Sequence, residues 1–271
     1  MTKTNLFNIL KYKIVRIIEK RPRLNILIYN NVRYFKFLLP HEKDYLGMKK
    51  ICENKKSKDI LDIGGNIGIS SLGFRQMGFK NRIFIFEPNF EIYKKYLLPL
   101  KKKNKDFHLH NIALGNQNKK KLFFLPFYKG QIIHYFASFD KKYLFNSLRM
   151  TFPEIINQIT FKKKKIKIQK FDDLKLNIKP HFIKIDVEGF DHIVIKGFLK
   201  TIKKYKPIFL VEYNIENYKK VCELLSGYRQ FVYNIKEDKL LKIEQSFFFK
   251  DIGRSNKKNL LSSRNIYFIP Q

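Results

Sequence analysis

Short apolar runs alternate along the chain with longer amphipathic stretches. A short run bounded by glycine, proline or charge is typical of a buried strand, and an apolar spacing of three to four residues is typical of a helix. Strands are predicted at Asp59–Ile63, Arg82–Phe86, Phe107–Ala113, His181–Glu188 and Ile208–Glu212, and helices at Ile67–Met77, Phe90–Lys101, Asp191–Lys204 and Asn217–Leu225. Strands separated by helices form βαβ units, so we expect a parallel sheet with right-handed crossovers.

The C-terminal part of the chain changes this pattern. Tyr228–Ile235 and Asn265–Ile269 are predicted to close the sheet as an antiparallel pair. The predicted fold class is therefore α/β, with a Rossmann-like, mostly parallel sheet and an antiparallel C-terminal strand. Residues 59–271 are expected to form this main domain.

Residues 1–58 are predicted to be a lead-in packed on the main domain. Leu6–Ile18 has the spacing of an amphipathic helix, for which a membrane surface is the alternative to the domain itself. Leu24–Leu39 alternates toward strand character, with Asn30-Asn31 as a hairpin turn. Glu42–Glu53 suits a helix.

The middle of the chain has the weakest pattern. Lys121–Phe127 is predicted to be a strand, and Lys165–Lys170 alternates apolar and basic residues. Tyr128–Phe161 has no clear period, so we expect substrate-facing loops there, with a plain surface insertion as the alternative.

A glycine-rich turn follows the first predicted strand. Gly64, Gly65 and Gly68 remove Cβ atoms where the chain turns and where a ligand can approach the backbone. Asn66 stands where the dinucleotide fingerprint has its second glycine, which disfavours a pyrophosphate. Asp62 places a carboxylate beside the turn, and a carboxylate suits the ammonium group of S-adenosylmethionine.

An acidic residue ends the second predicted strand. Glu87 lies 19 residues after Gly68, near the offset at which a carboxylate accepts hydrogen bonds from ribose hydroxyls in such folds. A helix N-cap is the ordinary alternative for a carboxylate in this place. Pro88, next to Glu87, and Asn111, in the third predicted strand, complete the candidate cofactor-binding residues.

Two carboxylates end the fourth predicted strand. If that strand persists through Val187, Asp186 and Glu188 share one face and point into the ligand crevice. Like charges at short range raise one pKa, which would make one of the two a base for an acceptor hydroxyl, and Asp186 would also attract the cofactor. The alternative is that Glu188 caps the next helix or turns away. His192 is a weaker candidate base.

The net charge is +33, from 56 basic and 23 acidic residues, and it raises nucleic acid as a partner. The lysines are spread over the whole chain, and the shortage of alanine suggests a bias in base composition, so nucleic acid is disfavoured without being excluded. Cys52 and Cys222 are too far apart for a zinc or disulfide pattern. No metal site, signal peptide or membrane span is expected, and a cytoplasmic protein is predicted.

Three passages together resemble the FkbM-type methyltransferases. They are Leu-Asp-Ile-Gly-Gly-Asn-Ile-Gly (61–68), Phe-Glu-Pro-Asn (86–89) and Ile-Lys-Ile-Asp-Val-Glu-Gly (183–189), followed by Gly197; Gly65 and Asp191 are mild departures. The resemblance covers about Asp59 to Asn214. It implies a seven-stranded class I methyltransferase fold, S-adenosylmethionine as cofactor, and O-methylation of a hydroxyl on a glycan or secondary metabolite. An RNA ribose methyltransferase and a catalytically silent nucleotide-binding module remain as alternatives.

Overall fold

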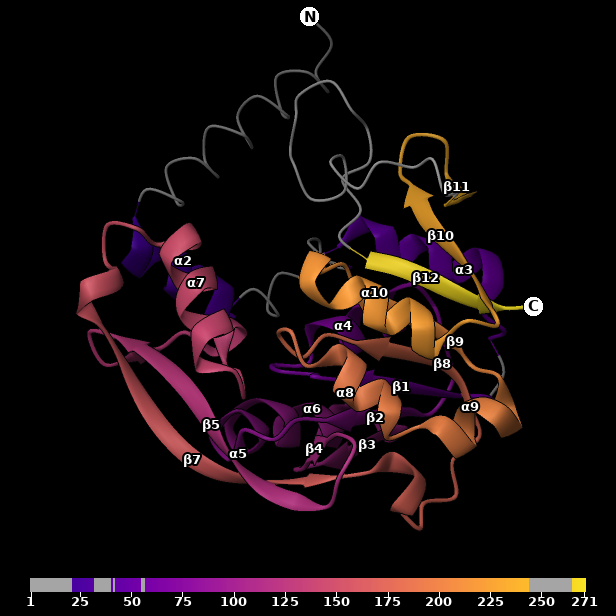
Figure 1. The fold of residues 1–271 in the computed structure, drawn as a ribbon, viewed down its shortest axis with the longest axis horizontal. Coiled ribbons are helices and arrows are strands. Elements are labelled where there is room, and N and C mark those ends of the chain that lie inside the picture. The colour runs from indigo at the N-terminus through magenta and orange to yellow at the C-terminus, as the bar shows by residue number, and fades with distance from the viewer. Residues whose placement is uncertain (1–20, 32–39, 41, 55–56, 244–264) are drawn as a thin grey trace, which may run out of the picture.

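A computed structural model describes residues 21–31, 40, 42–54, 57–243 and 265–271 (Figure 1). Its main feature is an eight-stranded sheet with the order β11-β10-β12-β9-β8-β1-β2-β3. The strands are β1 (Asp59–Ile63), β2 (Ile83–Phe86), β3 (Phe107–His110), β8 (Pro180–Ile185), β9 (Ile208–Glu212), β10 (Tyr228–Asn234), β11 (Lys239–Lys242) and β12 (Asn265–Pro270). The five strands from β9 to β3 are parallel, and β12 pairs antiparallel with both β9 and β10.

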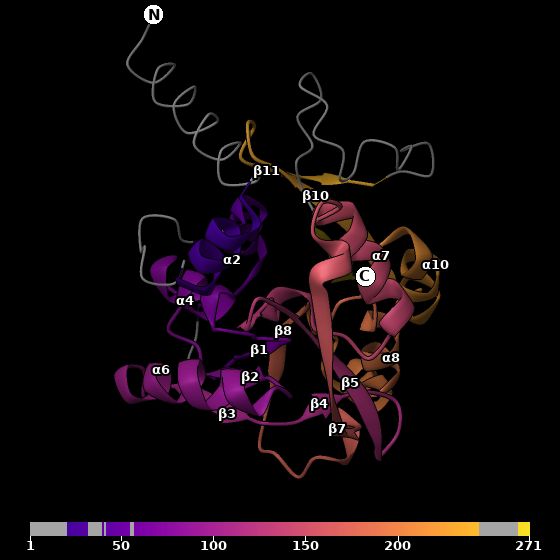
Figure 2. The ribbon, with the colours of Figure 1, turned by 90° about the vertical axis from the view of Figure 1, so that its left-hand side faces the viewer.

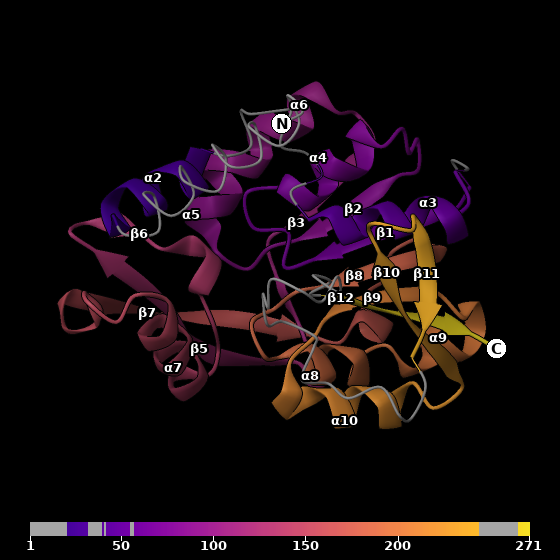
Figure 3. The ribbon, with the colours of Figure 1, turned by 90° about the horizontal axis from the view of Figure 1, so that it is seen from above.

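Helices cover both faces of this sheet (Figure 3). One face carries α8 (Asp191–Lys196), α9 (Leu199–Tyr205) and α10 (Ile215–Leu224). The other carries η3 (Lys43–Gly47), α3 (Met48–Ile51), α4 (Ile69–Gln76) and one continuous helical segment made of α5 (Phe90–Ile92), η4 (Tyr93–Leu97) and α6 (Leu98–Lys103). Each layer of helices buries its own apolar cluster against the sheet.

The two clusters follow from the alternation of side chains along each strand. In β8, Ile183 and Ile185 belong to the cluster under α8 and α10, whereas Phe182 packs on the α4 side. Lys184 has the parity of Phe182 and lies directly opposite Asp62 of β1 in the parallel register. A lysine and an aspartate therefore face the α4 side from the centre of the sheet.

A second sheet of four strands stands beside the first, in the order β4-β7-β5-β6. Its strands are β4 (Ala113–Leu114), β5 (Lys119–Tyr128), β6 (Gln131–Ile132) and β7 (Ile159–Gln169). The long β5 and β7 form an antiparallel ribbon that Figure 2 shows in front of the main sheet. Helices α2 (Pro22–Asn31) and α7 (Lys141–Thr151) pack with one end of this ribbon, where Ile26 and Leu144 share an apolar cluster with Tyr128.

The parallel core, its helices and the antiparallel closing pair are confirmed, and β11 adds an eighth strand at the edge. The predicted hairpin at Leu24–Leu39 is wrong in its first arm and turn, because Pro22 to Asn31 form helix α2. Proline is well accepted in the first turn of a helix, and the burial of Ile26 against α7 is tertiary packing that the local alternation did not indicate. Leu6–Ile18 and the second arm of the hairpin lie outside the described residues, and the domain boundary at residue 58 stays a prediction.

The expectation of loops over Tyr128–Phe161 is also wrong in part. The segment contains β6, η5 (His134–Phe136), the three-turn helix α7, η6 (Ile156–Gln158) and the start of β7. Leu144, Leu148 and Ile155 pack in one apolar cluster, and Phe139 packs in another with Phe123 and Ile168. The apolar spacing therefore follows two sets of neighbours and shows no single period. A short η7 (Phe171–Asp173) then leads back to β8.

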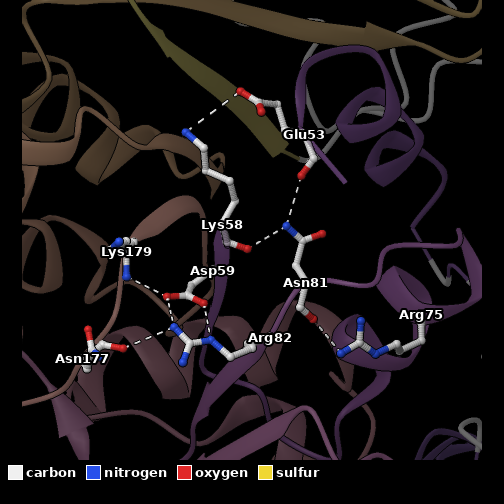
Figure 4. A network of polar contacts seen from close by, with 8 residues as sticks. All are labelled: Glu53, Lys58, Asp59, Arg75, Asn81, Arg82, Asn177 and Lys179. Carbon is white, nitrogen blue, oxygen red and sulfur yellow. Dashed lines mark hydrogen bonds and ion pairs between the residues drawn. The ribbon is translucent and has the colours of Figure 1, made fainter. Parts of the chain in front are cut away.

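The amino ends of β1 and β2 are tied together by polar contacts (Figure 4). Asp59, which is fully buried, accepts two hydrogen bonds of 2.8 Å from the guanidinium of Arg82 and one of 2.6 Å from the backbone N–H of Lys179. The side-chain amide of Asn81 donates to the carbonyls of Glu53 and Lys58. This network lies at the opposite end of the strands from the glycine turn, so it holds the sheet together and leaves the carboxyl ends free for chemistry.

Candidate cofactor and acceptor site

Three turns meet at the carboxyl ends of β1, β2 and β8. The backbone N–H of Gly64 donates to the carbonyl of Phe86 at 3.0 Å, and the backbone N–H of Asp186 donates to the carbonyl of Ile63 at 3.1 Å. The turn after β1 is thus held between the ends of its two neighbouring strands. In an open α/β sheet this edge is where ligands bind.

Gly64 is required by this convergence. It has a φ of +78°, and a Cβ built on it would lie 1.9 Å from the carbonyl oxygen of Asp186. Any other residue would push the turn after β1 away from the turn after β8. Asn66, two residues later, also has a positive φ of 48°, so the backbone of the turn is strongly curved before α4 begins at Ile69.

Glu87 is buried where β2 ends, with 6% of its surface exposed. One carboxylate oxygen accepts the backbone N–H of Asn66 at 2.9 Å, and the other accepts that of Asn89 at 2.7 Å. Asn111 donates from its side chain to the Glu87 carbonyl at 2.8 Å, and Pro88 is half-buried. Burial raises the pKa of Glu87 to about 7, and the two backbone donors oppose that rise. The glycine turn and the end of β2 are therefore joined through this carboxylate.

A buried ion cluster lies beneath the turn. The ammonium of Lys184, 1% exposed, lies 3.4 Å from Asp62 and 3.2 Å from Asp186, and Ser71 of α4 donates to the other oxygen of Asp62 at 2.6 Å. Burial alone would lower the pKa of Lys184, but Asp186 and Asp62 outweigh burial and the pKa is raised. One ammonium faces two carboxylates, so the cluster has a formal charge of −1.

The two aspartates differ in access. Asp62 is fully buried, whereas 32% of the Asp186 side chain is exposed. A direct contact between Asp62 and a ligand, as the sequence suggested, would require its carboxylate to leave Ser71 and Lys184. Asp186 can be reached without such a movement.

The expectation that Asp186 and Glu188 project from one persisting strand is wrong. Strand β8 ends at Ile185, and Glu188 has a φ of +53° in a turn. The turn is fixed from outside the strand, because Asn217 donates to the Gly189 carbonyl at 2.7 Å and Ser138 donates to the Glu188 carbonyl at 3.0 Å. The β8 strand therefore cannot impose a common face on the two carboxylates.

Glu188 nevertheless lies among acids. Its pKa is raised well above the usual range by burial, by the carboxylate of Glu212 and then by Asp186 and Asp191, although part of its surface is exposed. Asp191 is itself buried, and burial followed by Asp186 raises its pKa to about 7. A carboxyl group with a raised pKa is a stronger proton acceptor once it is ionised.

His192 lies apart from this group. It is on α8, and burial followed by the positive charges of Lys220 and Lys196 lowers its pKa. No hydrogen bond or ion pair among the described residues joins His192 to Asp186 or Glu188.

Sequence reasoning missed Lys184 and Tyr143. Lys184 interrupts the apolar run Phe-Ile-Lys-Ile, and a charged residue in the middle of a buried strand was a signal of a paired charge. Tyr143 of α7 lies against Gly189, since a Cβ on that glycine would be 3.2 Å from the tyrosine ring. Burial, Glu188 and Glu212 raise the pKa of Tyr143. Nothing local in the sequence joins residue 143 to residue 189.

Two searches over the described part of the chain were negative. No group of three or more histidine, cysteine, aspartate or glutamate side chains there is arranged to hold a metal ion. Among the helices that the structure describes, none is long and apolar enough to cross a membrane.

The strand order, the glycine turn and the acidic end of β2 define the Rossmann-like class I methyltransferase fold. The sequence profile described as Methyltransferase FkbM domain matches residues 62–242, which is more than half of the chain. The chain therefore belongs to the FkbM methyltransferase family.

Solved structures give distant similarities. An FkbM methyltransferase from Methylobacillus flagellatus KT is 14% identical, with a TM-score of 0.47, over 84% of this chain and 48% of that one. A precorrin-6y C5,15-methyltransferase from Geobacter metallireducens GS-15 is 14% identical, with a TM-score of 0.39, over 83% and 85%. A protein assigned as an rRNA-methylase from Clostridium thermocellum is 11% identical, with a TM-score of 0.41, over 83% and 90%.

The chain spans about half the length of the FkbM methyltransferase structure, of which 48% is covered. A search of curated proteins gave no significant match.

Proposed function

We propose that this protein is an S-adenosylmethionine-dependent O-methyltransferase that acts on a hydroxyl of a glycan or secondary metabolite in the cytoplasm. The proposal rests mainly on the position of Glu87, whose buried carboxylate accepts hydrogen bonds from Asn66 in the glycine turn and from Asn89 after β2. The chain that holds it belongs to a methyltransferase family. Such a carboxylate can accept both hydroxyls of a ribose, and it has acceptor capacity beyond the two backbone donors that it already binds.

The residues around Glu87 fit an adenosyl ligand. Asn66 Oδ1 and Asn89 Nδ2 are buried and have no hydrogen-bond partner within the described residues, so these two side chains offer one acceptor and one donor. Gly64 and Gly65 bring backbone without side chains to the same edge. We assign the amino-acid end of the ligand to the partly exposed Asp186, with Asp62 acting through Lys184.

When bound, S-adenosylmethionine supplies an electrophilic methyl group whose bond to sulfur breaks as the acceptor oxygen bonds to it, which leaves S-adenosylhomocysteine. The protein must align the acceptor hydroxyl and remove its proton. We assign proton removal to Glu188, because its pKa is raised by burial and by Glu212, and it lies in the turn after β8. The formal charge of −1 on the Lys184 cluster favours a cationic ligand nearby.

Glu87→Ala is expected to weaken the binding of S-adenosylmethionine roughly ten- to a hundredfold. Losing a charged, buried hydrogen bond costs about 1.5–3 kcal/mol, which converts to that range. Isothermal titration calorimetry measures the change. Glu91→Ala is the matched control, because Glu91 is an exposed glutamate on α5 that pairs only with Lys164 in the described residues. Equal affinities in the wild type and Glu87→Ala, with the fold intact, would remove Glu87 from the site.

Cofactor affinity is also expected to depend on pH through Glu87. With a pKa of about 7 in the free protein, the carboxyl is mostly protonated at pH 6 and mostly ionised at pH 8. Because the ionised form accepts hydroxyl donors on both oxygens, binding tightens as pH rises through 7 and is about tenfold weaker at pH 6 than at pH 8. Calorimetry at the two pH values tests this. Glu87→Gln should flatten the dependence, and an equal slope in that variant would assign the titration to another group.

The acceptor class is tested by transfer of tritium-labelled methyl groups. Purified protein and labelled S-adenosylmethionine are incubated with separate polysaccharide, small-metabolite and RNA fractions from the source cells. Label in an alkali-stable ether of a glycan or metabolite is expected. Label confined to RNA ribose, with retained binding at physiological salt, would replace this proposal by a nucleic-acid methyltransferase. No transfer to any fraction would favour a silent binding module.

A further inference from the structure

His134 is a buried imidazole whose ring nitrogens have no hydrogen-bond partner among the described residues. It begins η5, which joins β6 of the second sheet to α7, and only 5% of its surface is exposed. Neither of its ring nitrogens has a hydrogen-bond partner in the described part of the chain. Its ring lies among aromatic rings, with centroid distances of 6.4 Å to Tyr96 and 5.4 Å to Tyr135.

Contacts connect His134 to the glycine turn. The side-chain amide of Asn66 donates to the His134 carbonyl at 3.3 Å, and the backbone N–H of Asn66 donates to Glu87 at 2.9 Å. Tyr96, beside the imidazole, packs in one cluster with Ile67, the residue after Asn66. Residue 134 therefore reaches the turn from the second sheet, on the side where α5 and η4 begin.

Unpaired polar atoms gather on this side of the turn. Besides the two imidazole nitrogens, Asn66 Oδ1 and Asn89 Nδ2 are buried without partners among the described residues. Asn66 and Asn89 are the two residues whose backbone N–H groups bind Glu87. A buried polar group without a partner destabilises a fold. Stability therefore does not explain why such groups lie beside the glycine turn, whereas binding of a ligand does.

The charge state of the imidazole fits a cationic ligand. Burial lowers the pKa of His134 to about 3, so the ring is neutral at physiological pH. A neutral imidazole offers one N–H donor and one acceptor nitrogen and does not repel a sulfonium. The same low pKa makes it a weak proton acceptor, which argues for binding over proton transfer.

We propose that His134 closes the cofactor site from the second sheet by hydrogen-bonding the adenosyl part of the ligand that Glu87 holds. This inference rests on the proposed function and adds to it a binding residue outside the motifs of the main sheet. It gives the second sheet a direct part in cofactor binding.

The test uses the full-length protein and three variants, His134→Phe, His134→Gln and His108→Phe. Phenylalanine keeps the aromatic packing and removes both polar atoms, whereas glutamine keeps one donor and one acceptor. His108→Phe makes the same chemical change on β3, where the imidazole stacks on Phe84 at 4.6 Å. For each variant, calorimetry gives the affinity for S-adenosylhomocysteine, and thermal melting without ligand gives Tm.

His134→Phe is expected to bind S-adenosylhomocysteine about tenfold more weakly than the wild type. Its Tm without ligand should be equal to or higher than that of the wild type, because unpaired buried polar atoms are removed. His134→Gln should stay within about threefold of the wild type in affinity, as one hydrogen bond or less is lost, and His108→Phe should match the wild type. Weaker binding with an unchanged or raised Tm is a result that a purely structural role would not give.

Two results would overturn this inference while leaving the proposed function intact. One is wild-type affinity in His134→Phe, and the other is a loss of affinity in a variant whose Tm without ligand has also fallen. A wild-type protein that does not bind S-adenosylhomocysteine while it is folded would overturn the proposed function, and the inference with it.

Discussion

Replacing Lys184 by methionine is expected to lower the free energy of unfolding by about 3–5 kcal/mol, because a buried carboxylate then loses its counter-charge. Asp62 is fully buried and, among the described residues, would keep only the hydroxyl of Ser71 as a partner. Asp186 is partly exposed and can turn toward water, so most of the cost arises at Asp62. Urea denaturation followed by circular dichroism measures the change.

A double variant separates lost pairing from lost packing. In Asp62→Asn with Lys184→Met, the buried charge is absent, and the amide can still accept the Ser71 hydrogen bond. This double variant should be more stable than Lys184→Met alone, by about 2 kcal/mol or more. If the two substitutions destabilise additively, the ion pair does not account for the effect and the methionine merely packs badly.

Glu188→Gln is expected to lower the methyl-transfer rate by about 10²–10⁴-fold while cofactor affinity stays near that of the wild type. The amide preserves the shape of the side chain and removes its ability to accept a proton. Because the pKa of Glu188 is raised, the wild-type rate should rise with pH as this carboxyl ionises. The rate of Glu188→Gln should not show this rise with pH. Initial rates with the acceptor found by labelling, measured across pH, give both results.

Two further variants define the role of Glu188. Glu154→Gln removes an exposed glutamate from the segment between α7 and β7 and should leave the rate unchanged. Asp186→Asn should weaken cofactor binding more than it slows transfer, since Asp186 is assigned to the ligand. If Glu188→Gln and Asp186→Asn both keep wild-type turnover with bound cofactor, the turn after β8 is not the catalytic centre. The base would then lie in the second sheet or the segment from Tyr128 to Phe161.

The parts of the site that sequence predicted are those in which one residue type is required locally. Gly64 could be predicted because no Cβ fits beside the Asp186 carbonyl, and because it follows a short strand that is buried along its whole length. The position of Glu87 could be predicted from the sequence because the length of a βα unit sets the spacing between the ends of two neighbouring strands. The parallel order of the main strands follows from the same units.

The parts that sequence did not predict depend on contacts between distant segments. Glu188 adopts a positive φ because Asn217 and Ser138 bind the backbone of its turn, and neither lies near it in the chain. The sequence predicts most of β5 but only the end of β7, because the lysines of residues 162–165 interrupt the apolar alternation of β7. Lys164 pairs with Glu91 of α5, and Lys162 lies over the ring of Phe127 in β5, so both lysines have partners within the fold.

The second sheet contacts both halves of the candidate site. Through His134 it reaches the glycine turn, and through α7 it places Tyr143 against the turn after β8. Both contacts bring residues of one inserted segment to the two halves of the candidate site.

The proposed function requires that S-adenosylmethionine binds at the carboxyl edge of β1 and β2. Parallel calorimetric titration of the wild-type protein with S-adenosylmethionine and with NAD, under the same conditions, tests this requirement. Saturable one-to-one binding of S-adenosylmethionine, with no detectable binding of NAD, is the expected result. Tighter binding of NAD, or no heat of binding with S-adenosylmethionine for a folded protein, would contradict the proposed function.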